Sequence, residues 1–230
     1  MFLSPMDGIG FSAGNLAPPP AISSSYLANL YASVSSNTKT FSGASIGDAD
    51  SKRKIVVTII GENQTGRIVS SVTVAGVSCS LANPSPTSRL HSGVTTAEIW
   101  STDSFITSGT TGDIVITWDG TQTRYYVGTY RALNLGSPHD AFTSSASTPT
   151  GSINIPAGGS VFAHCHSSAG TNTYTWTGPT ERFDANPIST ITHSGASDDY
   201  ATAQSGLTVT ASPSGTMNAP ALTCVSFSKA

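Results

Sequence analysis

The chain has 230 residues, of which 37% are hydrophobic and only 10% charged, with a formal net charge of −3 and a pI of about 5.9. Its ten basic residues are too few and too scattered to form the basic surface that binds nucleic acid or an anionic membrane. The hydrophobic fraction is enough for a core, and this length suits one large all-β domain, so a disordered chain is excluded.

Three local patterns complete this overview. The one basic cluster, Lys52-Arg53-Lys54, follows Asp48 and Asp50 and is interpreted as a solvated turn. No run of about 18 apolar residues occurs, so we expect no membrane-spanning helix. The first seven residues lack a basic start and an apolar stretch, so we expect no secretory signal and synthesis in the cytoplasm.

Residues 1–38 differ from the rest of the chain and are predicted to form an extended arm. Pro18-Pro19-Pro20 and the surrounding glycines are typical of a segment without regular structure. Ser23-Ser24-Ser25 is expected to cap a short helical turn over residues 26–31. Such an arm either packs on its own domain or reaches a neighbouring subunit. The candidate anchors in a partner are the apolar side chains Phe2, Leu3, Met6 and Phe11.

From Thr40 onward, short β-branched and aromatic runs alternate with Gly, Pro, Asn, Asp and Ser. Turn residues recur about every 8–12 residues, which is typical of β-sandwiches. Asp119-Gly120 is a hairpin signal, and strand patterns continue on both sides of the polar stretch 140–150. We therefore predict one antiparallel, jelly-roll-like β-sandwich over residues 39–230. The expected strands lie near residues 39–46, 54–61, 68–77, 94–103, 113–119, 123–133, 160–166, 172–178, 200–204, 206–212 and 221–228.

The cysteines are odd in number, and each lies in a strand-like run: Cys79, Cys165 and Cys224. We interpret them as reduced, buried core thiols, since free cysteine is often buried. The alternatives are one internal disulfide or a cross-link between subunits. Replacing Cys165 by serine is expected to destabilise the protein by about 1–3 kcal/mol, because the hydroxyl would lack a partner.

His164 and His166 lie two residues apart, so they share one strand face with Phe162. Two imidazoles on one face can share a metal ion, and His193 with Asp198-Asp199 would complete such a site. Without a defined third ligand, the pattern instead indicates a polar patch on a partly exposed face. We predict no metal site and little effect of replacing both histidines by alanine. The opposite, buried face is expected to carry Val161, Ala163 and Cys165.

The sequence shows no catalytic pattern. Glycoside hydrolysis needs two carboxylates across a cleft, whereas the chain has three glutamates without paired spacing, and Glu98 stands alone in its run. Gly-x-Ser-x-Gly and phosphate-loop motifs are also missing. We therefore predict that the protein is not an enzyme and has no cofactor.

Aromatic side chains leave a second possibility open. Exposed on a sheet they would stack on sugar rings, as in a carbohydrate-binding module, whereas in a sandwich they usually form the core. The residues concerned are Trp100, Trp118, Trp176, Tyr125, Tyr126, Tyr130 and Tyr174.

Four strand-and-turn stretches resemble a group of β-rich virion proteins of tailed bacteriophages and alphaproteobacterial prophages: residues 41–57, 69–77, 112–118 and 201–210. The resemblance covers residues 40–228 and transfers no catalytic or ligand-binding residue. It implies a virion structural protein (head decoration, collar or tail component) that contacts capsid, neck or tail proteins. We expect a homo-oligomer, first a trimer. The alternatives are a carbohydrate-binding module for a host glycan and, less favoured, a polysaccharide hydrolase.

Overall fold

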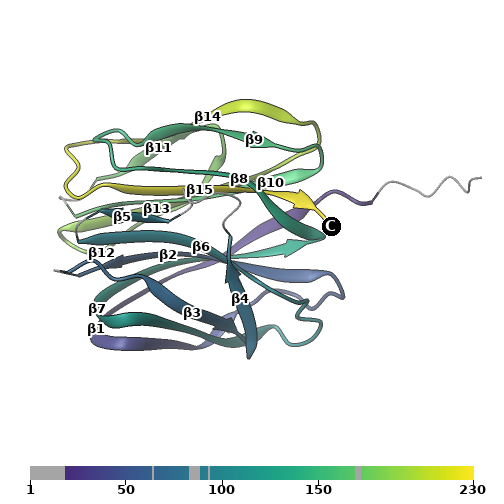
Figure 1. The fold of residues 1–230 in the computed structure, drawn as a ribbon, viewed down its shortest axis with the longest axis horizontal. Helices are drawn as coiled ribbons and strands as arrows, with labels where there is room; N and C mark the ends of the chain where they lie inside the picture. The colour runs from purple at the N-terminus through teal and green to yellow at the C-terminus, as the bar shows by residue number, and fades with distance from the viewer. Residues whose placement is uncertain (1–18, 64, 83–88, 93, 169–171) are drawn as a thin grey trace, which may run out of the picture.

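The computed structural model describes residues 19–63, 65–82, 89–92, 94–168 and 172–230 (Figure 1). In this part of the chain the regular structure consists of strands β1 to β15, without helices, and all strand pairs are antiparallel. The predicted all-β, antiparallel class is confirmed. The strands form a closed five-stranded barrel and two open sheets, a division that the prediction of one sandwich did not contain.

The barrel closes because β7 is long enough to pair with both the first and the last of the other four strands. Its strand order is β7-β2-β6-β4-β3, and β3 pairs back to β7. The first half of β7 pairs with β3 and its second half pairs with β2. Closure leaves no free edge among these strands. Their bounds are β2 (Arg53–Glu62), β3 (Val69–Val74), β4 (Val77–Leu81), β6 (Thr95–Thr102) and β7 (Thr111–Leu133).

The hairpin predicted at Asp119-Gly120 is wrong, because β7 runs through this pair as one strand. Here β7 exchanges one neighbour for another, and glycine in a strand often marks such a site of close approach. A Cβ atom on Gly120 would lie 2.5 Å from the guanidinium carbon of Arg67. The glycine therefore leaves room for the Arg67 side chain and does not form a turn.

Strand β1 (Ser23–Ser45) lies along β7, and the short β5 (Leu90–Ser92) pairs with β6. The helical turn predicted for residues 26–31 is therefore wrong. Successive side chains of β1 point to different faces: Leu27 packs on the barrel core, whereas Tyr26 packs on Phe183 of another sheet. Residue 38, the predicted end of the arm, falls inside β1. The candidate anchors Phe2, Leu3, Met6 and Phe11 lie outside the described residues.

The remaining strands form a five-stranded sheet of order β12-β13-β10-β15-β8 and a three-stranded sheet of order β11-β14-β9. The larger sheet, called here the central sheet, lies between the barrel and the smaller sheet (Figure 1). Both faces of its inner strands β10 and β15 are therefore buried. The bounds are β8 (Leu135–Ser144), β9 (Thr150–Ile155), β10 (Gly159–Ser167), β11 (Tyr174–Thr177), β12 (Thr180–Ile188), β13 (Ile191–Tyr200), β14 (Gln204–Pro213) and β15 (Ala221–Lys229).

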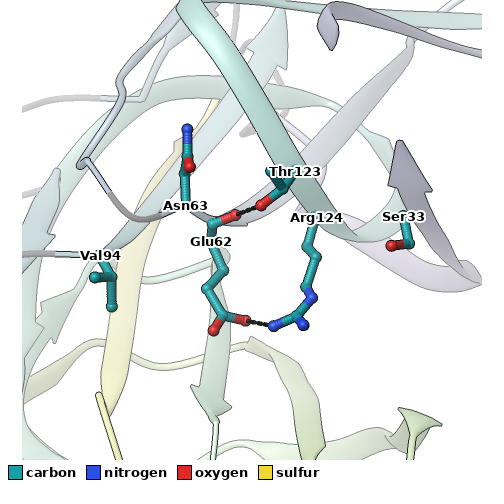
Figure 2. A pocket seen from close by; sticks show the side chains of 6 residues that line it. All are labelled: Ser33, Glu62, Asn63, Val94, Thr123 and Arg124. Atoms are coloured by element: carbon teal, nitrogen blue, oxygen red, sulfur yellow. Dashed lines mark hydrogen bonds and ion pairs between the residues drawn. The ribbon is translucent and has the colours of Figure 1, made fainter. Parts of the chain in front are cut away.

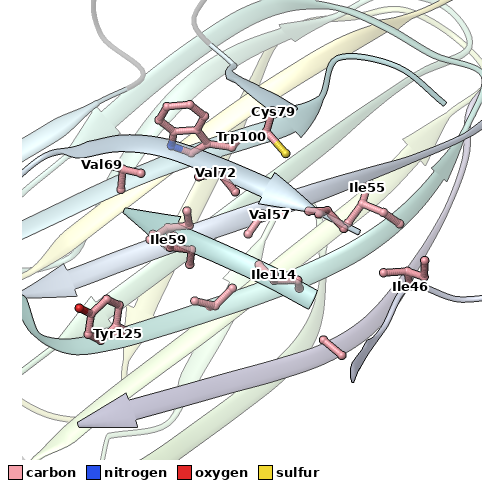
Figure 3. Close-up of a cluster of buried hydrophobic side chains, with 14 of the residues drawn as sticks. Ile46, Ile55, Val57, Ile59, Val69, Val72, Cys79, Trp100, Ile114 and Tyr125 are labelled. Carbon is pink, nitrogen blue, oxygen red and sulfur yellow. The ribbon is translucent and has the colours of Figure 1, made fainter. Parts of the chain in front are cut away.

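The barrel interior is a closely packed apolar cluster that includes Ile55, Ile59 and Ile114 (Figure 3). A separate cluster, which includes Val161, Cys165 and Val209, fills the space between the central sheet and the three-stranded sheet. Two further clusters join the central sheet to the barrel. The chain thus has one apolar core inside the barrel and another between the two open sheets.

Two charged side chains are also fully buried in the barrel. Arg53 donates hydrogen bonds to loop carbonyl oxygens, so the solvated turn predicted for Lys52-Arg53-Lys54 is wrong at its middle residue. Glu98 forms an ion pair with Arg89 at 2.9 Å and accepts a hydrogen bond from the Trp100 indole at 2.8 Å. Burial raises the pKa of Glu98, and these partners oppose the shift. Both buried charges are therefore matched by polar partners.

Candidate functional site

The structure brings together the three histidines that the sequence singled out. β10 carries His164 and His166, β13 carries His193, and each is at most 1% exposed. His164 Nε2 and His193 Nδ1 lie 3.0 Å apart in a hydrogen bond. The centroid of the Tyr126 ring, on the barrel, lies 4.9 Å from that of His166 and 5.2 Å from that of His193. The prediction of a partly exposed face is wrong, because the barrel covers it.

The predicted carboxylate partners lie elsewhere. Asp198 and Asp199 are at the other end of β13, where they pair in register with Val161 and Ser160. Asp199 accepts hydrogen bonds from Ser24 at the start of β1. In the described parts of the chain, no group of three His, Cys, Asp or Glu side chains has the geometry to hold a metal ion.

Burial keeps the histidine cluster uncharged. It lowers the pKa of His166 and of His193 to about 3. The pKa of His164 is also well below its ordinary value, through burial and then through its two histidine neighbours. Backbone hydrogen bonds at Thr58 for His164 and at Ala219 for His166 oppose these shifts but do not cancel them. Three polar side chains buried this completely are uncommon and costly, so this cluster demands a physical explanation.

A pocket of about 590 Å³ opens beside the cluster at one end of the barrel (Figure 2). The Glu62 Oε2 atom accepts a hydrogen bond from Arg124 at 3.1 Å and one from the Tyr126 hydroxyl at 3.4 Å. The same oxygen lies 3.7 Å from Nε2 of His166. Glu62 therefore connects the pocket to the buried histidines. The lining residues are Ser33, Glu62, Asn63, Val94, Thr123 and Arg124.

The pocket offers hydrogen-bonding groups and no evident reaction. Its one lining carboxylate among the described residues, Glu62, is already paired with Arg124, whereas glycoside hydrolysis needs two carboxylates. Sequence reasoning did not single out this pair. Its signal is a cross-strand pairing of opposite charges between β2 and β7. That signal becomes visible only once the two strands are known to be neighbours.

The aromatic residues do not form an exposed stacking face. Six of the seven side chains are buried, and the half-buried Trp176 donates a hydrogen bond from its indole nitrogen to Ser194. They are core residues, as is usual when two sheets pack together. The carbohydrate-binding alternative therefore loses the platform on which it was based.

The cysteines are buried and free, as predicted. Burial raises the pKa of the Cys79 and Cys165 thiols to about 12, and it also raises that of Cys224. Since the thiolate is the reactive form, these groups are inert in the folded protein.

Comparisons with protein-family models, with curated proteins and with solved structures find no significant match. The described residues contain no helix long and apolar enough to cross a membrane. The function is therefore inferred from the strand arrangement and the side chains.

Proposed function

We propose that the protein is a structural component of a bacteriophage virion, made in the host cytoplasm and acting through contacts with other virion proteins without catalysis. The strand order of residues 135–229 carries this proposal. The two open sheets contain the orders β8-β15-β10-β13 and β9-β14-β11. Eight consecutive antiparallel strands produce these two orders when they fold as a jelly roll, an architecture common in viral capsid domains. The one departure is β12, which extends the larger sheet beside β13.

The surface chemistry also supports a role in assembly. Strand β1 has 23 residues and carries Lys39 as its single charged residue. It lies at the edge of its sheet, where most proteins place charges to prevent association. Four register shifts interrupt its pairing with β7, and such irregularities make an edge a poor template for a further paired strand. We therefore propose that a neighbouring subunit contacts the side chains of β1 and does not add a strand to its edge. We propose a homo-oligomer, with a trimer as the first expectation.

Particle analysis tests the proposal directly. Particles would be purified from the phage or prophage that encodes the chain, with its reading frame intact or disrupted, and analysed by mass spectrometry and electron microscopy. We expect the chain in stoichiometric amounts in intact particles, its density missing from disrupted ones, and restoration by the purified protein. Exclusion of the chain from particles, with a monomeric purified protein, would contradict the proposal.

Carbohydrate binding is the second candidate, because the pocket beside Glu62 presents several hydrogen-bonding side chains and jelly rolls also occur in lectins. A glycan array with the wild-type protein and an Arg124→Ala variant separates the two roles. Binding that the substitution abolishes would favour attachment to a host glycan. A hydrolase is the least favoured role, since the pocket's described lining has one carboxylate.

A further inference from the structure

Three buried histidines lie where two separately packed parts of the chain meet. The barrel has its own apolar core, and so does the space between the central sheet and the three-stranded sheet. Each part therefore retains a core if the contact between them is lost. His164, His166 and His193 lie on the face of the central sheet that contacts the barrel. We propose that these three histidines form a proton-operated latch, which holds the barrel on the central sheet while they are neutral and releases it when they are protonated.

The contact around the histidines is tight. The ring of Phe183 lies 5.6 Å from that of His164 and 5.2 Å from that of His193, measured between centroids. A Cβ atom on Gly195, which pairs with His164 across the sheet, would lie 2.6 Å from the hydroxyl of Tyr130 on the barrel. Beside His164 and His193 there is thus no space to hydrate an added charge. A protonated cluster must find partners among its neighbours or separate from them.

The neighbouring charges cannot compensate for three protons. From the barrel, β2 contributes Glu62, whose carboxylate already pairs with Arg124 of β7. The other strands in contact add tyrosines, a second arginine, one further carboxylate and uncharged side chains. That carboxylate, Asp199, lies at the far end of β13 and is already hydrogen-bonded to Ser24 and Ser160. One nearby carboxylate thus faces three potential imidazolium ions and a guanidinium ion. The further titratable or charged side chains described around this contact are Tyr126 and Tyr130 of β7, Tyr26 and Tyr31 of β1, and Arg182 of β12.

The direction of the response follows from the two states. In the closed state the pKa of His166 and of His193 is about 3, whereas a hydrated histidine has a pKa of about 6.5. The open state therefore binds protons that the closed state excludes. Below about pH 6.5, each histidine should raise the equilibrium constant for opening by about tenfold per pH unit. The latch is closed at neutral pH and opens on acidification, independently of the proposed virion role.

Hydroxyl-radical footprinting of the full chain, read residue by residue by mass spectrometry, tests the latch. Between pH 7.5 and pH 5, we expect oxidation to rise at the contact residues Tyr126, Tyr130 and Phe162. Trp118 in the barrel core and Tyr174 between the two open sheets should stay protected. A simultaneous rise at all five residues would mean ordinary acid unfolding and would overturn the proposal.

Variants assign the response to the histidines. The triple substitution His164→Asn, His166→Asn and His193→Asn should abolish the rise in oxidation at the contact. The matched control His139→Asn, at an exposed position on β8, should retain it. Because the triple variant can fail to fold, the imidazole protons of the wild type are also followed by NMR. The three buried histidines should titrate together with the opening; independent titration near pH 6.5 without opening, or a response unchanged in the triple variant, would refute the latch.

Discussion

Replacing Arg53 by methionine tests how far the barrel depends on one buried cation. The Nε atom of Arg53 donates to the carbonyl oxygen of Ile106 at 2.8 Å. Its two terminal nitrogens donate to the carbonyl oxygens of Gly47 at 2.7 Å, Ser108 at 2.6 Å and Gly109 at 2.9 Å. The side chain thus joins the loop that contains Gly47 to the loop of residues 106–109 at one end of the barrel. Methionine retains the apolar stem and removes every one of these donors.

The magnitude follows from these four bonds. Hydrogen bonds to a charged group contribute about 1.5–3 kcal/mol each, so four of them set a ceiling of about 6–12 kcal/mol. The freed carbonyl groups lie in loops that water can reach after a small movement, so we expect a loss of about 3–5 kcal/mol in the free energy of unfolding. Arg53→Lys keeps the charge but not the planar fork, and should lose about 2 kcal/mol.

Urea unfolding at pH 7.5 measures these losses through the fluorescence of Trp100 and Trp118, both in the barrel core. Lys52→Met is the matched control, because Lys52 is exposed next to Arg53 and should change stability by less than about 0.5 kcal/mol. A loss below about 1 kcal/mol for Arg53→Met, or one equal to that of the control, would refute the view that this cation fastens the loops.

Gly195→Ala should destabilise the protein by about 1–3 kcal/mol in urea unfolding through overpacking, since its Cβ atom would lie 2.3 Å from the Phe183 ring. Iodoacetamide at pH 8 should label no cysteine until urea unfolds the chain, as mass spectrometry would show, because the pKa of Cys165 is about 12 and the other two thiols are similarly buried. Stability should fall between pH 6.5 and 4.5, where the unfolded chain binds protons that the folded His166 and His193, with a pKa of about 3, do not. A loss of about 1.4 kcal/mol per histidine per pH unit, smaller near pH 6.5 where protonation is half complete, gives about 5 kcal/mol for the two histidines in urea titrations. Far-UV circular dichroism should show β structure with less than about 10% helix.

The strands rich in β-branched residues could be predicted from the sequence, and those that depend on a neighbour could not. The run 54–61 became β2 (Arg53–Glu62) almost without change, because valine and isoleucine favour a pleated, buried surface. The residues of β1 are mainly serine, alanine, asparagine and leucine, which carry no such preference, and its two tyrosines alone do not make a strand pattern. Pairing with β7 decides their conformation, and the paired residues lie about 65 to 110 positions further along the chain.

The alternation of apolar and polar residues could not predict barrel closure, for a related reason. Alternation of apolar and polar residues serves a barrel and a sandwich equally, and the difference between them is one pairing, that of β3 with β7. The contact between Glu62 and Arg124 could not be predicted for the same reason, because it requires knowing that β2 and β7 are neighbours. Which strands are neighbours is a property of the whole chain, whereas the strand signal is local.

The histidines show where alternation itself fails. Every residue of β10 is buried, because one face of the strand packs on the barrel and the other on the three-stranded sheet. Period-two reasoning assumes that one face is wet, and so it assigned the imidazoles to solvent. In a strand covered on both faces, a polar residue among valine, phenylalanine and cysteine signals a buried polar contact instead. Charging such a buried group is costly, and burial holds the pKa of His166 and of His193 at about 3. This contact is therefore the place where the fold should yield first to acid.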